Sequence, residues 1–134
     1  MKIKQPLKIN GMDWAWITAA RGYTVKPVKA LGPNSGTMRS GLVVEDCLGL
    51  RDEVTIPLLV RNRQTVTELL RCLHQEKYAT VYYLDLDAGV ARTEQCTYRE
   101  PTARNVLTTV DGVSYWDCGS LVFTTRNLVV RYGD

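Results

Sequence analysis

The side chains best suited to chemistry are the single histidine, His74, and four cysteines: Cys47, Cys72, Cys96 and Cys118. A thiol beside an imidazole can act as a nucleophile with its base. Cys72 lies only two residues from His74 in a predicted helix, so these two side chains point to different sides. The cysteines are scattered and form no CxxC pair, the spacing from which zinc sites are usually built. The pattern favours buried free thiols over a catalytic or zinc site.

Paired carboxylates are the second group with chemical potential. Asp85 and Asp87 flank Leu86 on one face of a predicted strand, and further acidic pairs occur at residues 45–46 and 52–53. Such pairs can bind a metal ion or act as acid and base. These carboxylates lie at predicted strand ends and turns, where acidic residues are common, and no EF-hand loop is present. We therefore expect no metal site, no cofactor and no enzymatic activity.

A third group could bind nucleic acid, because aromatic and basic residues occur on two neighbouring predicted strands. Its members are Tyr82, Tyr83, Arg92, Tyr98 and Arg99. The same segment carries four acidic residues, namely Asp85, Asp87, Glu94 and Glu100. The formal net charge is only +3, from 17 basic and 14 acidic residues, which is too mild to indicate a nucleic-acid partner. A small β-rich module that binds nucleic acid or a protein remains the alternative function.

One amphipathic helix is predicted over residues 61–77, and it must position much of the core. Its apolar stripe has helical spacing and consists of Val66, Leu69, Leu70 and Leu73. Thr65 and Glu68 match the capping-box pattern, and Asn62 is a rival cap one turn earlier. The opposite face carries Arg63, Glu68 and Arg71. We expect the stripe to lie on a sheet and the polar face to be solvated or to contact another subunit.

The rest of the chain alternates as strands and turns. Strands are predicted at residues 7–9, 12–17, 23–31, 41–49, 52–60, 78–86, 90–98, 105–110, 113–116 and 120–131. Trp14 and Trp16 would share one face of the second strand, as core or as an interface. Pro27 and Pro57 indicate edge positions or strand ends. Residues 78–98 predict one hairpin, and the Asp111–Gly112 turn predicts another.

A long glycine-rich loop at residues 32–41 is predicted to be an arm that orders against a neighbour. The residues of this candidate interface are Gly32, Pro33, Asn34, Ser35, Gly36, Thr37, Met38 and Arg39. The loop exceeds the usual hairpin connection, and long loops often carry function. It contains no phosphate-binding motif.

These elements predict one domain over residues 1–134. The expected fold class is mainly β, a β-sandwich or flattened barrel of about eight strands with one α-helix packed on it. No apolar run approaches the roughly 20 residues of a membrane span, and no signal peptide is recognisable. We therefore expect no membrane anchor and synthesis in the cytoplasm.

Several short motifs, taken in order, resemble those of small bacteriophage and prophage tail proteins with a tail-tube fold, as in the ring domain of distal tail proteins. They lie at residues 7–11, 38–41, 57–59 (before the helix), 82–85 and 115–116. The resemblance implies a non-enzymatic subunit of a hexameric homo-oligomeric ring, in a tube, distal tail or baseplate adaptor. Its partners would be copies of itself and neighbouring tail proteins, with phage DNA only as passing cargo, and its location would be the virion tail.

The resemblance also implies that the arm packs on a neighbouring ring or subunit. Tube lumens in that family tend to be acidic, whereas this chain is slightly basic. This departure leaves open whether the protein lines the channel or occupies an adaptor position.

Overall fold

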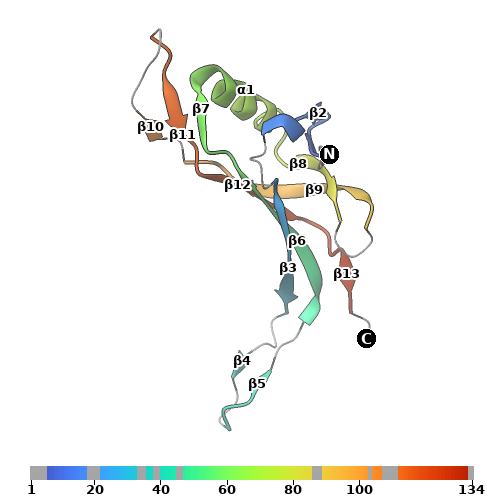
Figure 1. Ribbon diagram of the computed structural model, residues 1–134. Helices are drawn as coiled ribbons and strands as arrows, with labels where there is room; N and C mark the ends of the chain where they lie inside the picture. The colour runs from blue at the N-terminus through green and yellow to red at the C-terminus, as the bar shows by residue number, and fades with distance from the viewer. Residues whose placement is uncertain are drawn as a thin grey trace.

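The structure is a computed structural model that describes residues 6–17, 22–32, 36–37, 40–44, 47–85, 89–102, 104–106 and 112–132. Figure 1 shows its elements in chain order. They are β1 (Lys8–Ile9), β2 (Met12–Asp13), the 3-10 helix η1 (Ala15–Ile17), β3 (Thr24–Leu31), β4 (Gly36–Thr37), β5 (Val43–Val44), β6 (Cys47–Pro57), β7 (Val60–Asn62), α1 (Arg63–Leu73), β8 (Ala79–Leu84), β9 (Ala91–Arg99), β10 (Arg104–Val106), β11 (Tyr115–Asp117), β12 (Ser120–Thr125) and β13 (Val130–Arg131).

Eight of these strands form one antiparallel sheet. β12, β9, β8, β1 and β2 follow β6 in that order, and β3 pairs with β6 as well. Along β6, β12 pairs with the segment around Ile56, whereas β13 pairs with Gly49 and Leu50. β10, β11 and β7 form a smaller three-stranded sheet, and β4 pairs with β5. The predicted fold class, mainly β with one helix, is confirmed.

The long strand β6 replaces the two strands predicted at residues 41–49 and 52–60. It continues through residues 50–51 because β3 pairs with it from Thr55 to Cys47. Gly49 is required within it, because a Cβ there would lie 2.1 Å from the Val130 carbonyl oxygen of β13. Pro57 ends the strand as predicted, and Pro27 lies in β3, whose described partner is β6 alone.

The strand predicted at residues 12–17 is wrong beyond Asp13. The Asp13 carboxylate accepts a hydrogen bond from the Ala15 backbone N–H at 2.9 Å, a local interaction that favours a turn over a strand. The chain then forms η1, so Trp14 and Trp16 do not share a strand face. Trp14 is fully buried and Trp16 is 56% exposed, although their rings stack at 5.4 Å.

The remaining strand predictions are close to the structure. β8 and β9 form the predicted hairpin, with Ala79 opposite Cys96. β10 and β11 pair as predicted, with Val106 opposite Tyr115, although the turn residue Asp111 lies outside the described residues. The last predicted strand is divided into β12 and β13 near residues 126–127, where a bend was expected.

Helix α1 is shorter than the predicted residues 61–77, and its cap is the earlier one. The Asn62 side-chain oxygen accepts from the Thr65 backbone N–H at 2.8 Å, so Thr65 lies inside the helix and does not cap it. Val66, Leu69 and Leu73 of the stripe are buried as predicted. Leu70 is only half-buried, and Cys72 is buried as well.

Removing this cap should weaken the protein measurably. We expect Asn62→Ala to lower the free energy of unfolding by about 1 kcal/mol, because an N–H group of the first turn loses its acceptor. Thr65→Ala is the matched control and should change stability by less than about 0.5 kcal/mol. Urea denaturation monitored by circular dichroism measures both values. A larger loss of stability in Thr65→Ala than in Asn62→Ala would contradict the assignment of Asn62 as the helix cap.

One apolar core joins the helix to the large sheet. The face of the sheet that carries Val54, Val81 and Phe123 is buried under α1 and the segment around Trp14, and we call it the inner face. The Tyr23 hydroxyl donates to the Pro6 carbonyl oxygen at 2.5 Å and accepts from the Leu84 N–H at 2.9 Å, and so ties the start of β3 to the segment before β1 and to the end of β8. Among the described residues, no helix is long and apolar enough to cross a membrane.

Candidate functional site

The structure places Cys72 and His74 in different surroundings, in line with the expectation that they point to different sides. Cys72 is buried, and its thiol donates to the Ile9 carbonyl oxygen at 3.2 Å and lies 3.4 Å from Trp14 Nε1. His74 lies at the helix C-terminus, is exposed, and contacts the Glu100 carboxylate through Nε2. The thiol belongs to the core and the imidazole to the surface, so they form no catalytic pair.

The other thiols are free as well. Burial, with help from the charges of Glu94 and Asp52, raises the pKa of Cys96 to about 12. Burial also raises the pKa of Cys118. These two thiols are protonated at neutral pH and are therefore poor nucleophiles and poor metal ligands. In the described part of the chain, no cluster of three His, Cys, Asp or Glu residues is arranged to hold a metal ion.

Two buried carboxylates, Asp85 and Asp52, make polar contacts on the inner face. Asp85 is buried and pairs with Arg92 Nε at 2.9 Å, and Arg92 also contacts Glu94 at 3.2 Å. Asp52 is buried and accepts a 2.6 Å hydrogen bond from the Tyr83 hydroxyl. Burial and this hydrogen bond raise the pKa of Tyr83. The Asp52–Tyr83 hydrogen bond ties β6 to β8, and the Asp85–Arg92 pair ties the end of β8 to β9. Asp87 and residues 45–46 lie outside the described residues.

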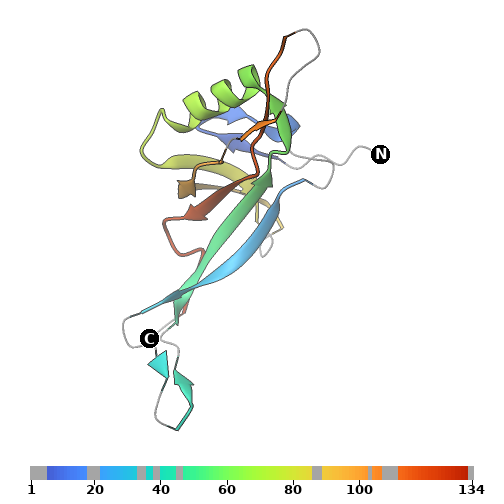
Figure 2. The same ribbon diagram turned by 90° about the vertical axis from the view of Figure 1, so that its left-hand side faces the viewer.

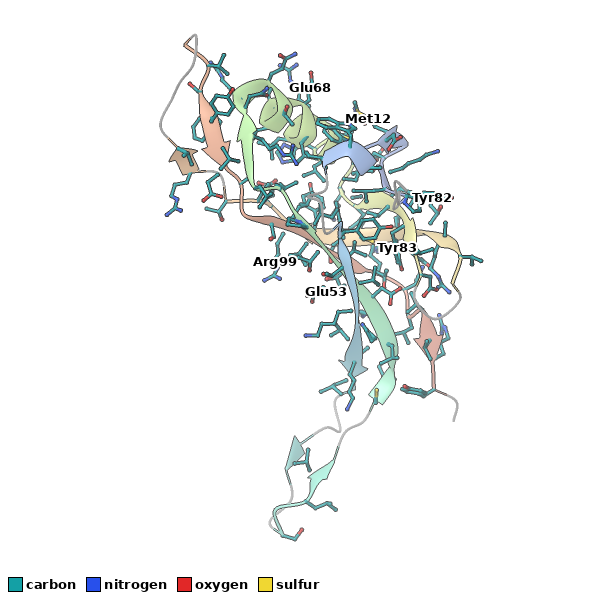
Figure 3. All side chains as sticks on the ribbon, in the orientation of Figure 1. Met12, Glu53, Glu68, Tyr82, Tyr83 and Arg99 are labelled. Carbon is teal, nitrogen blue, oxygen red and sulfur yellow. The ribbon has the colours of Figure 1, made fainter. Side chains whose placement is uncertain are left out.

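The predicted aromatic and basic set does not form one surface. Tyr82 and Tyr83 are neighbours on β8 and therefore face opposite sides of the sheet; Tyr83 is fully buried. The Tyr98 ring packs edge-on against Phe123 at 6.2 Å. Arg99 is exposed but lies at the far end of β9 from Tyr82 (Figure 3). Strand alternation distributes the set over both faces and both ends of the hairpin.

The predicted arm lies at the end of a projecting hairpin. β3 and β6 run away from the body, and β4 and β5 lie beyond their far end (Figures 1 and 2). Of the predicted arm residues, the structure describes Gly32, Gly36 and Thr37. The predictions for Pro33, Asn34, Ser35, Met38 and Arg39 fall outside the described residues.

Four exposed aliphatic side chains flank the predicted arm, and we call them the hairpin-end patch. They are Leu31, Leu42, Val43 and Leu48, which are between 49% and 63% exposed. Sequence reasoning found the loop by its glycines but placed these side chains in ordinary strands at residues 23–31 and 41–49. No residue of β3 is buried along its whole length, so its strand pattern did not reveal which side chains would face a partner.

The polar face of α1 lies at the other end of the molecule (Figure 2). Arg63, Glu68 and Arg71 are all exposed, as predicted, and Figure 3 shows Glu68 on the outward side of the helix. A hollow of about 440 Å³, which we call the helix-end hollow, lies between the first turn of α1 and the segment before β11. Its lining residues are Arg63, Gln64, Thr67, Gly112, Val113 and Ser114. The Arg63 N–H donates to the Ser114 carbonyl oxygen at 3.0 Å and so holds the two walls together.

The most distinctive surfaces are therefore an apolar patch at one end and a hollow at the other. Neither presents a nucleophile with a base. Comparison of the chain with protein-family models, curated proteins and solved structures finds no match.

Proposed function

We propose that this protein is a non-enzymatic structural subunit of a phage tail or tail-like particle, which assembles with copies of itself into a ring. It would be made in the host cytoplasm and incorporated into the virion tail. The observation that carries the proposal is the projecting hairpin, with the hairpin-end patch at its far end. The motif resemblance described above supports the choice of particle.

The hairpin-end patch exposes apolar side chains to solvent, which is unfavourable in a monomeric protein. Leu31, Leu42 and Leu48 each expose about half or more of their side chain, and apolar side chains exposed at one end of a molecule are candidates for an interaction site. Among the described residues, β4, β5 and β13 lie at this end, and they leave the four side chains exposed. A second protein surface is the natural cover.

The occupant that we propose for the helix-end hollow is the hairpin-end patch of a neighbouring copy. The hollow is lined partly by Val113, which is 39% exposed, so it offers an apolar contact to a leucine or valine. The two surfaces lie at opposite ends of the molecule (Figure 2). A contact between different surfaces of identical chains is head-to-tail, and it closes into a ring when the rotation between copies allows.

The engagement of the reactive side chains is consistent with a non-enzymatic role. Cys72 bonds to Ile9 and Trp14, and Asp85 pairs with Arg92. His74 contacts Glu100 on an open surface. These contacts hold elements of the fold together.

Removing the apolar side chains should weaken assembly without unfolding the protein. We expect the triple variant Leu31→Ser, Leu42→Ser, Leu48→Ser to raise the concentration needed for assembly at least tenfold, because the neighbour loses its apolar contact. Mass photometry and size-exclusion chromatography with light scattering measure the assembly state. Val90→Ser is the matched control, since Val90 is 61% exposed on the β8–β9 connection.

A cross-link tests the contact itself. When a Leu42→Cys protein is mixed with a Val113→Cys protein and oxidised, a disulfide-linked dimer should form. A Val90→Cys protein mixed with the Val113→Cys protein should not form one. A wild-type chain that remains monomeric at millimolar concentration would contradict the ring proposal, whereas assembly without the cross-link would contradict only the docking of the patch in the hollow.

A further inference from the structure

A second hollow, of about 280 Å³, lies on the outer face of the large sheet, opposite the core. Its lining residues are Arg51, Thr97, Thr124, Thr125 and Arg126. They come from β6, β9 and β12 and from the bend that follows β12. Arg51 precedes the buried Asp52 and Thr97 follows the buried Cys96, so both side chains face away from the core. We call this the arginine hollow.

Both guanidinium groups in the arginine hollow are held by neutral partners. Arg51 Nη1 donates to the Thr125 carbonyl oxygen at 3.1 Å and also to the Arg126 carbonyl oxygen. Arg126 Nη1 donates to Gln95 Oε1 at 2.8 Å, and its guanidinium carbon lies 3.7 Å from the centre of the Tyr78 ring. Within the described residues, neither arginine forms an ion pair with a carboxylate. Their positions are fixed while their charges remain uncompensated by these contacts.

Thr97 and Thr124 complete the lining, whereas the Thr125 side chain is buried and its hydroxyl accepts from the Asp52 N–H at 3.1 Å. The Thr97 hydroxyl donates to the Thr124 carbonyl oxygen at 3.4 Å, a long hydrogen bond that a stronger acceptor can replace. Glu53 lies opposite Thr124 in the register and is the acidic residue beside the hollow on this face. On its other side Glu53 is opposite Lys26 of β3, so the local balance of Lys26, Glu53, Arg51 and Arg126 is positive.

We infer that the arginine hollow binds a phosphate-type oxyanion, a site independent of ring assembly. Guanidinium groups offer several N–H donors in a plane that matches the oxygens of a phosphate. Two of them, fixed in advance, avoid much of the entropy that ordering long side chains would cost. The anion is either free phosphate or a phosphodiester of a nucleic acid, since both present the same oxygens.

Titration with inorganic phosphate, followed by amide chemical shifts of the ¹⁵N-labelled protein, tests this inference. We expect saturable shifts at Arg51, Thr97, Thr124 and Arg126. Arg126→Gln should weaken phosphate affinity about tenfold or more, because it removes charge-assisted hydrogen bonds. Arg99→Gln is the matched control, since it removes an equal charge from the same strand as Thr97, outside the hollow. The test replaces Arg126 and not Arg51, because the Arg51 side chain also holds the bend after β12 in place.

Competition with a short single-stranded oligonucleotide distinguishes the two sources of phosphate. If the oligonucleotide displaces phosphate and loses affinity in Arg126→Gln, the site accepts a phosphodiester. If phosphate binds and the oligonucleotide does not compete, the site accepts free phosphate. An absence of saturable shifts, or equal losses of affinity in Arg126→Gln and Arg99→Gln, would overturn the inference.

Discussion

Replacing Trp14 with alanine is expected to lower the free energy of unfolding by about 3–5 kcal/mol, the range for large aromatic side chains removed from a core. Trp14 is fully buried, and its indole N–H lies 3.4 Å from Cys72 Sγ on α1. Its backbone N–H donates to the Leu7 carbonyl oxygen at 2.9 Å. The residue thus joins the first strands to the helix, and alanine would leave a cavity between them.

Trp16→Ala is the matched control, since the chemical change is identical and the side chain is 56% exposed. It should cost no more than about 1.5 kcal/mol, chiefly from the lost stacking on Trp14. Urea denaturation followed by circular dichroism, which does not depend on tryptophan emission, measures both variants and the double variant. Equal costs for Trp14→Ala and Trp16→Ala would contradict this arrangement of the two rings.

The elements predicted well from sequence are those specified by neighbouring residues. The stripe of α1 has a period set by the helix itself, so the spacing of Val66, Leu69 and Leu73 predicts their burial without knowledge of the surface that covers them. The β8–β9 hairpin likewise joins two strands adjacent in the chain. Residues 12–17 show the limit of this reasoning. Their alternation imitates a strand, but one carboxylate, that of Asp13, caps a turn and redirects Trp16 into solvent.

The candidate surfaces depend on contacts between distant parts of the chain. Arg51 and Arg126 are 75 positions apart and meet only because β12 pairs with β6 in one register. No local pattern predicts that register. The hairpin-end patch was missed for a related reason. Leu31 and Leu48 have the residue type of a buried strand, and only the length of β3 and β6 beyond the core exposes them.

The largest expected effect of pH concerns Cys96. Its side chain is fully buried between β8 and β12, with Ala79 and Thr125 opposite it. The thiol contacts the Glu94 carbonyl oxygen at 3.6 Å. Burial, then the charges of Glu94 and Asp52, raises its pKa from 9.0 to about 12. A thiolate in this position would lose its hydration and face two acidic residues.

The direction of the pH effect follows from the higher pKa in the folded state. The unfolded chain releases the Cys96 proton first, so this contribution is fully present below about pH 9 and is lost as the pH rises toward 12. Between about pH 9 and pH 11, Cys96 alone should cost about 2 kcal/mol of the free energy of unfolding. Tyr83, whose pKa burial also raises, adds to the loss above its usual pKa of 10.0.

The Cys96→Ala variant separates the contribution of the Cys96 thiol to the pH dependence of stability from the contributions of other groups. At pH 7 the variant should be less stable than the wild type by about 1 kcal/mol, because a buried sulfur is lost. At about pH 11 it should be as stable as the wild type or more stable, since it has no thiol to ionise when the chain unfolds. Urea denaturation at a series of pH values measures both curves.

Cys47→Ala is the control for removing a thiol, because Cys47 is half-buried at the start of β6. The pH dependence of the Cys96→Ala curve is compared with that of this variant and of the wild type. Parallel curves for Cys96→Ala would show that the thiol ionises as readily in the folded protein as in the unfolded chain. That outcome would contradict the dry, acidic surroundings that β6, β8 and β9 create around this side chain.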